Sequence, residues 1–98
     1  MIKKQEVLDF FKSHRQLIIE RFGVKHLALF GSVVRDEARE DSDLDVLVEF
    51  EGKETYRNYF DLLFYLEDNL HCKIDLVNRD SVRPQLKPHI ENEALYVA

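Results

Sequence analysis

The sequence has little of what defines several classes of small protein. It contains one cysteine, two prolines, three glycines and no tryptophan. A lone cysteine excludes a disulfide framework, and the scarcity of proline and glycine argues against a flexible linker. No apolar run approaches the ~20 residues that span a bilayer, and the N-terminal residues are charged where a signal peptide requires an apolar run. We therefore expect a cytoplasmic protein that does not associate with membranes.

A stripe of basic residues is also missing. The net charge is −5 and the pI is about 5.3, so we expect no direct binding of nucleic acid. Nine of the 19 acidic residues lie between positions 35 and 54. Such an acidic region repels a bare nucleotide, but it can attract a nucleotide that carries Mg²⁺.

The chain of 98 residues, 45% hydrophobic and 34% charged, has the size and composition of one globular domain, residues 1–98. Apolar spacing predicts helices before Gly23 and over 55–70, and apolar runs predict strands at 26–30, 44–50 and 73–77. The apolar stripe expected on the second helix is Tyr56, Phe60, Leu63, Leu66 and Leu70. A helix of one to two turns is expected over 33–38, and Ser81 can cap another short helix. A helical tail with a break at Pro88 should follow. The predicted fold class is α/β (α+β), a small sheet of about three strands with helices packed on it.

The stretch "SDLDVLVEF" opens a strand with two acids. Side chains alternate along a strand, so Asp43 and Asp45 share a face and repel each other. A divalent cation removes that conflict, and Mg²⁺ prefers carboxylate oxygen together with substrate phosphates. In "KIDLV", Asp75 points away from its apolar neighbours. If the two strands are adjacent, three carboxylates converge as metal ligands, and one can help to deprotonate a hydroxyl.

"FGSVVRDEA" has the pattern of a phosphate-binding turn. Gly31 allows a phosphate to approach the backbone, and the hydroxyl of Ser32 can donate to a phosphate oxygen. Arg35 can reach the same anion or fix a catalytic carboxylate. Each motif alone is more often an ordinary turn or a solvated strand end, so only their combination indicates function.

This combination resembles the nucleotidyltransferase superfamily related to DNA polymerase beta, and within it the minimal nucleotidyltransferases (MNT), antitoxins that accompany HEPN-domain RNase toxins. Gly31-Ser32, ten residues and then Asp43-x-Asp45 match the family pattern. Arg35-Asp36-Glu37-Ala38 matches its "R-x-E-A", Ser42 to Asp45 its "S-D-x-D", and "KIDLV" with Asp75 its third-carboxylate strand. The resemblance covers essentially the whole chain.

The resemblance implies a mixed nucleotidyltransferase sheet and Mg-dependent transfer of AMP from ATP to a hydroxyl, a tyrosine, of a partner HEPN toxin. Asp43, Asp45 and Asp75 would be the catalytic and metal-binding residues. The nucleotide-binding residues would be Gly31, Ser32, Arg35 and Ser42. Two other functions stay open: an antitoxin that neutralises by binding alone, and a nucleotidyltransferase that acts on a small molecule. The complete set of acids favours catalysis, and the absence of a second domain disfavours a small acceptor.

Overall fold

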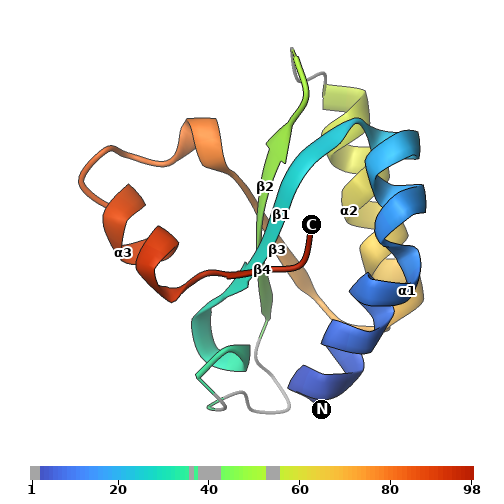
Figure 1. The fold of residues 1–98 in the computed structure, drawn as a ribbon, viewed down its shortest axis with the longest axis horizontal. Coiled ribbons are helices and arrows are strands. Elements are labelled where there is room, and N and C mark those ends of the chain that lie inside the picture. Colours follow the sequence, from blue (N-terminus) through green and yellow to red (C-terminus); the bar gives the residue numbers. More distant parts are fainter. Residues whose placement is uncertain (1–2, 36, 38–42, 53–55) are drawn as a thin grey trace.

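A computed structural model describes residues 3–35, 37, 43–52 and 56–98, and its centre is a mixed sheet (Figure 1). The strand order is β3-β2-β1-β4. Strand β1 pairs antiparallel with β2 and β4, whereas β2 and β3 are parallel. The predicted mixed sheet is confirmed, but it has four strands among the described residues, because a short strand near the C-terminus adds to the edge. The bounds are Val24–Phe30 for β1, Leu44–Phe50 for β2, Ile74–Asn78 for β3 and Leu95–Tyr96 for β4.

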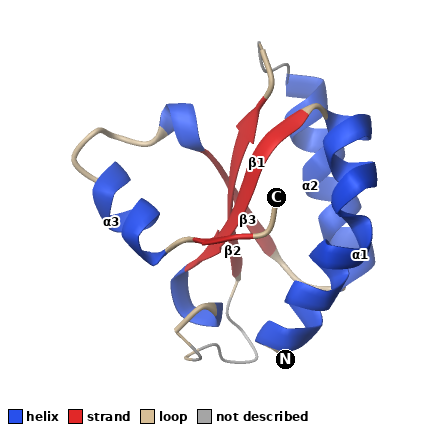
Figure 2. Ribbon diagram, viewed as in Figure 1, coloured by secondary structure: helices blue, strands red, loops and turns tan. Residues whose placement is uncertain are grey.

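The helices divide between the two faces of the sheet. Helices α1 (Lys4–Phe22) and α2 (Tyr56–Leu70) cover one face, and the short helix α3 (Lys87–Glu93) lies on the other (Figure 2). The main core lies between the first pair of helices and the sheet. Within the described part of the chain, no helix is long and apolar enough to cross a membrane.

Helix α1 packs on the sheet through side chains spaced at three to four residues or multiples of that spacing. It ends at Gly23, which adopts the left-handed conformation with φ 67° and donates its N–H to the carbonyl of Ile19. A glycine is favoured there because a Cβ is strained at positive φ. The buried residues of α1 are Val7, Phe11, Ile18 and Phe22.

Helix α2 buries a slightly different stripe from the predicted one. Leu62 and Leu66 are fully buried, whereas Phe60, which was expected in the apolar stripe, is 44% exposed. Phe64 is also exposed, and its ring stacks on that of Phe60 at a centroid distance of 6.1 Å. The buried face is therefore set by Leu62, Leu66 and Leu70, which recur every four residues as one side of a helix does.

The alternation along β2 decides which face of the sheet carries the acids. Leu44, Val46 and Val48 belong to the core beneath α1 and α2. Asp45 and Leu47, one residue out of step, therefore point to the face that carries α3. Leu47 is buried there opposite Ala28 of β1.

Three helical predictions differ from the structure. Where a helix of one to two turns was expected over 33–38, the described residues form a 3₁₀ turn, η1 (Gly31–Val33), and positions 36 and 38 lie outside the described residues. Helix α3 contains Pro88 in its first turn, where a break was expected. Proline is tolerated at that position because the N–H groups of a first helical turn have no acceptor within the helix. The capped helix expected at Ser81 is a second 3₁₀ turn, η2 (Arg79–Ser81), preceded by Asn78 as its cap.

Candidate active site

Asp45 and Asp75 lie side by side at the open face of the sheet. Strands β2 and β3 are parallel, and their register pairs Asp45 with Asp75. Directly paired residues of adjacent strands are ~4.8 Å apart and point to the same face. Two carboxylates from separate parts of the chain therefore meet there, as the apolar neighbours of each acid predicted.

Asp45 is the electrostatic centre of this arrangement. Its partial burial, followed by the charge of Asp75, a hydrogen bond with Asp75 and the charge of Asp43, raises the pKa of Asp45 to about 6. The positive charge of Arg35 opposes these effects. Burial and the neighbouring carboxylates together favour a proton or a cation at Asp45.

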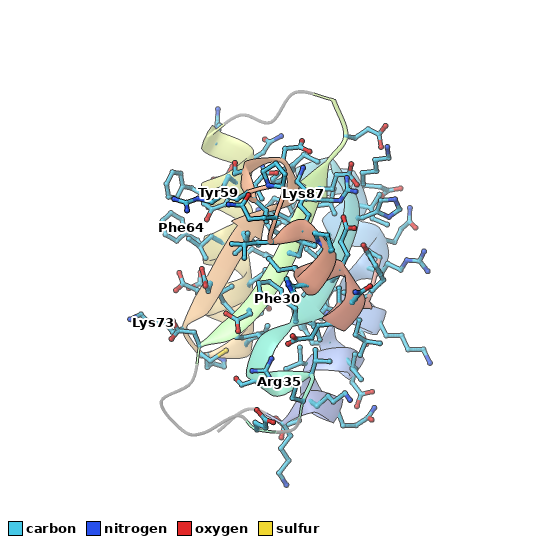
Figure 3. All side chains as sticks on the ribbon, turned by 90° about the vertical axis from the view of Figure 1, so that its left-hand side faces the viewer. Phe30, Arg35, Tyr59, Phe64, Lys73 and Lys87 are labelled. Carbon is cyan, nitrogen blue, oxygen red and sulfur yellow. The ribbon has the colours of Figure 1, made fainter. Side chains whose placement is uncertain are left out.

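The turn at Gly31 lies directly against Asp45. Gly31 has φ +78°, and a Cβ on it would lie 2.0 Å from Oδ2 of Asp45. Only glycine allows the backbone to adopt this conformation and to pass so close to the carboxylate. The turn and the acid therefore form one site. Phe30, the residue before Gly31, pairs with Asp45 across the strands, and Figure 3 labels Phe30 and Arg35 on this side of the molecule.

A residue that the sequence did not indicate joins this site from α3. Oε1 of Glu93 accepts a hydrogen bond from the N–H of Gly31 at 2.6 Å and another from Nη1 of Arg35 at 2.5 Å. Nε of Arg35 also donates to Glu37 at 3.1 Å, and this bond, with the charge of Glu93, raises the pKa of Arg35. Because α3 returns to the site from 62 residues along the chain, no local pattern revealed Glu93.

The other predicted residues are placed less tightly. Asp43 directly precedes β2 and is exposed, although its charge reaches Asp45. Ser32 is half-buried, and its carbonyl accepts a hydrogen bond from the backbone of Glu37. Ser42 lies outside the described residues. Of the seven residues predicted from sequence, Gly31, Arg35, Asp43, Asp45 and Asp75 are linked to one another by the contacts and charges described above.

The three carboxylates have the donor atoms that a divalent cation prefers, but their arrangement in the structure does not yet form a metal site. Asp43, Asp45 and Asp75 offer only oxygen donors, which Mg²⁺ prefers. Burial, together with the charges of Asp75 and Asp43, raises the pKa of Asp45, and a cation would offset both effects. Among the residues that the structure describes, however, no three acidic, histidine or cysteine side chains are grouped closely enough to hold a metal ion as they lie. A cation held by all three therefore requires the exposed Asp43 to turn inward, and the three-ligand site stays a prediction.

Curated relatives resemble nearly the whole chain. A protein named protein adenylyltransferase MntA, from Thermococcus cleftensis, is 37% identical over 97 residues, which is 99% of this chain and 98% of that protein. A protein of Methanocaldococcus jannaschii, named as a candidate protein adenylyltransferase, is 40% identical over 93 residues, or 94% and 95% of the two chains.

Solved structures share the fold. One, named as a candidate minimal nucleotidyltransferase, superposes with a TM-score of 0.85 at 34% identity and covers 96% of this chain and 95% of its own. Another contains a tri-AMPylated HEPN toxin of Shewanella oneidensis in complex with an MNT antitoxin. It has a TM-score of 0.66 at 16% identity, with coverage of 93% and 71%, and at that identity it bears on the fold alone.

The family predicted from the sequence is confirmed. The model of the nucleotidyltransferase domain family matches residues 8–97. The residues that suggested this family, from the Gly31 turn to Asp75, fall within the match, and the structure gathers several of them at one site. The chain belongs to the nucleotidyltransferase domain family.

Proposed function

We propose that this protein is an adenylyltransferase that acts as an antitoxin, transferring AMP from ATP to a tyrosine hydroxyl of a HEPN-type toxin. Relatives that align with nearly its full length are named protein adenylyltransferases. The observation that carries the proposal is the pairing of Asp45 with Asp75 beside the Gly31 turn. Acids and an anion-accepting turn at one place are what transfer of a nucleotidyl group requires.

In this reaction the hydroxyl oxygen attacks the α-phosphorus of ATP, its bond to phosphorus forms, and pyrophosphate leaves as the bond to the β-phosphate breaks. The backbone turn at Gly31, the hydroxyl of Ser32 and the guanidinium of Arg35 would bind the phosphates, with Ser42 assisting. Asp75 lies beside Asp45 and would accept the proton of the attacking hydroxyl. A carboxylate in this position also aligns the hydroxyl for attack.

Family members use a divalent metal, and we propose Mg²⁺ held by Asp43, Asp45 and Asp75. When bound, the ion supplies positive charge against the triphosphate, which would otherwise be repelled by these acids. Residues 1–98 would form one minimal nucleotidyltransferase domain, and this domain would act in the cytoplasm, where ATP and a ribonuclease toxin meet.

The decisive measurement is the intact mass of the partner toxin after incubation with this protein, ATP and Mg²⁺. We expect mass increments of one or more AMP units with the wild type and none with Asp43→Ala/Asp45→Ala. Asp9→Ala/Asp68→Ala is the matched control, because it also removes two acids, both exposed on the helices of the opposite sheet face. This control should modify the toxin normally.

The same variants separate the catalytic function from neutralisation by binding alone. Circular dichroism should show that Asp43→Ala/Asp45→Ala is folded, because it removes charges that repel each other. It should fail to protect cells from the toxin at limiting dose. If it protects as well as the wild type at equal abundance, the protein is a binding antitoxin and not an enzyme.

A further inference from the structure

One carboxylate oxygen ties α3 to the anion-binding groups of the site. Oε1 of Glu93 accepts hydrogen bonds from the N–H of Gly31 and from Nη1 of Arg35. Both bonds are charge-assisted, because the acceptor is a carboxylate and one of the donors is a guanidinium. Glu93 therefore already occupies two of the donors that a nucleotide phosphate would use.

A phosphate oxygen and a carboxylate oxygen compete for the same donors. Each is an anionic acceptor that suits a backbone N–H and a guanidinium. The single N–H of Gly31 cannot donate to the carboxylate of Glu93 and to a phosphate oxygen at the same position. The triphosphate must therefore either displace Glu93 or bind more weakly at this turn.

The structure makes displacement inexpensive. Helix α3 buries none of its residues. Among the described residues, α3 is also held by an ion pair between Glu91 and Arg79 of η2, at 2.9 Å. The side chains of Arg35 and Glu93 are 47% and 31% exposed, so an incoming anion can reach them from solvent.

We propose that Glu93 is an internal competitor for ATP: its carboxylate fills the phosphate-binding donors of Gly31 and Arg35 in the free protein, and the triphosphate replaces it. The inference rests on the proposed function, since it concerns the same nucleotide site. Glu93 therefore lowers the affinity for ATP. In the nucleotide complex the bonds of Glu93 to Gly31 and Arg35 are broken, so α3 is no longer tied to the turn.

The test is calorimetric titration with α,β-methylene-ATP, which cannot transfer AMP, in the presence of Mg²⁺. Glu93→Gln keeps the size of the side chain but removes the competing charge, so the Kd should fall by about two- to fivefold, the range of a partly exposed ion pair. Glu91→Gln is the matched control, because it removes the same charge from the same helix while its partner is Arg79. The Kd of Glu91→Gln should stay within about 1.5-fold of the wild-type value. Glu91 shares no hydrogen-bond donor with the ligand, so its charge acts on the ligand only through solvent, where salt screens the interaction.

A second readout follows the turn itself. The amide resonance of Gly31 in a ¹H–¹⁵N spectrum should shift in Glu93→Gln and not in Glu91→Gln, and this spectrum also verifies that each variant is folded. If Glu93 only held the turn in place, its replacement in Glu93→Gln would raise the Kd for the nucleotide. A raised or unchanged Kd in that variant, with normal binding by the wild type, overturns this inference and leaves the proposed function intact. Absence of binding in every variant overturns both.

Discussion

Asp45 shows how much a single side chain at this site depends on its neighbours. Gly31 lies against its carboxylate, Asp75 lies beside it, and Arg35 acts on it from the turn. The balance of these effects is unfavourable to the charged form, since the pKa is raised to about 6. A carboxylate of this kind favours function at the expense of the stability of the free protein.

The raised pKa of Asp45 predicts how stability changes with pH in the absence of metal. The folded state retains the proton up to about pH 6, whereas the unfolded chain loses it near 4. The contribution of Asp45 to the free energy of unfolding therefore falls as pH rises from about 4 to 6 and is constant above that range. The full effect would be roughly 3 kcal/mol, and solvent screening at this partly exposed group reduces it to about 1 kcal/mol.

Urea unfolding of the wild type and of Asp45→Asn at several pH values measures this effect. The variant cannot ionise, so its free energy of unfolding should exceed that of the wild type by about 1 kcal/mol at pH 7 and should match it at pH 4. A difference that does not change between pH 4 and 7 would show that ionisation of Asp45 is not the cause.

At the scale of elements, the 3₁₀ turn η1 joins β1 to the site and depends on one glycine. Gly31 and Gly52 both have positive φ, +78° and +71°. They differ in surroundings, because a Cβ on Gly52 would meet nothing within 4 Å, whereas one on Gly31 would meet Asp45. Substitutions at the two glycines therefore distinguish the energetic cost of backbone strain from that of steric contact.

Gly52→Ala should lower the free energy of unfolding by about 1 kcal/mol, the cost of a left-handed alanine. Gly31→Ala should cost about 2 kcal/mol or more, because the carboxylate of Asp45 must also move, and it should abolish AMP transfer. Chemical denaturation gives the stabilities and the mass assay gives the activity. In Gly31→Ala/Asp45→Ala part of the lost stability should return. Equal stability of Gly31→Ala and Gly52→Ala would contradict the contact between the turn and Asp45.

In the whole molecule, the hydrophobic core and the candidate active site lie on opposite faces of the sheet. The core fills the space between the helices α1 and α2 and the sheet, while the acids and α3 occupy the opposite face (Figure 1). Ligands at that face should stabilise the folded state by linkage without any change in the core. The stabilisation is therefore a measure of site occupancy.

At pH 7.5, Mg²⁺ with α,β-methylene-ATP at about ten times the Kd should add about 1.4 kcal/mol of stability. For a domain of this size that corresponds to a rise in Tm of about 5–10 °C. Asp43→Ala/Asp45→Ala should show little rise, and Asp9→Ala/Asp68→Ala should show the full one. The measurement is differential scanning fluorimetry, and an equal rise in both variants would place the ligand away from the acids.

The family and the main elements could be predicted from the sequence because their causes are local. The alternation around Asp45 and Asp75 follows from strand geometry, and Gly23 ends α1 as its conformation requires. The predictions were weaker where packing decides: Phe60 is exposed, η1 is shorter than a helix, and β4 was not foreseen. Apolar spacing in a short segment does not specify which residues find a partner to pack against.

The sequence by itself determined which residues carry the chemistry, because residue types and their spacing along a strand set the faces on which they lie. Only the tertiary structure decided which of them meet. The parallel register pairs Asp45 with Asp75, and the return of the chain through α3 brings Glu93 to Gly31 and Arg35. The physical reason is that the sheet register and the packing of a distant helix depend on contacts between segments far apart in the chain, which local patterns do not encode.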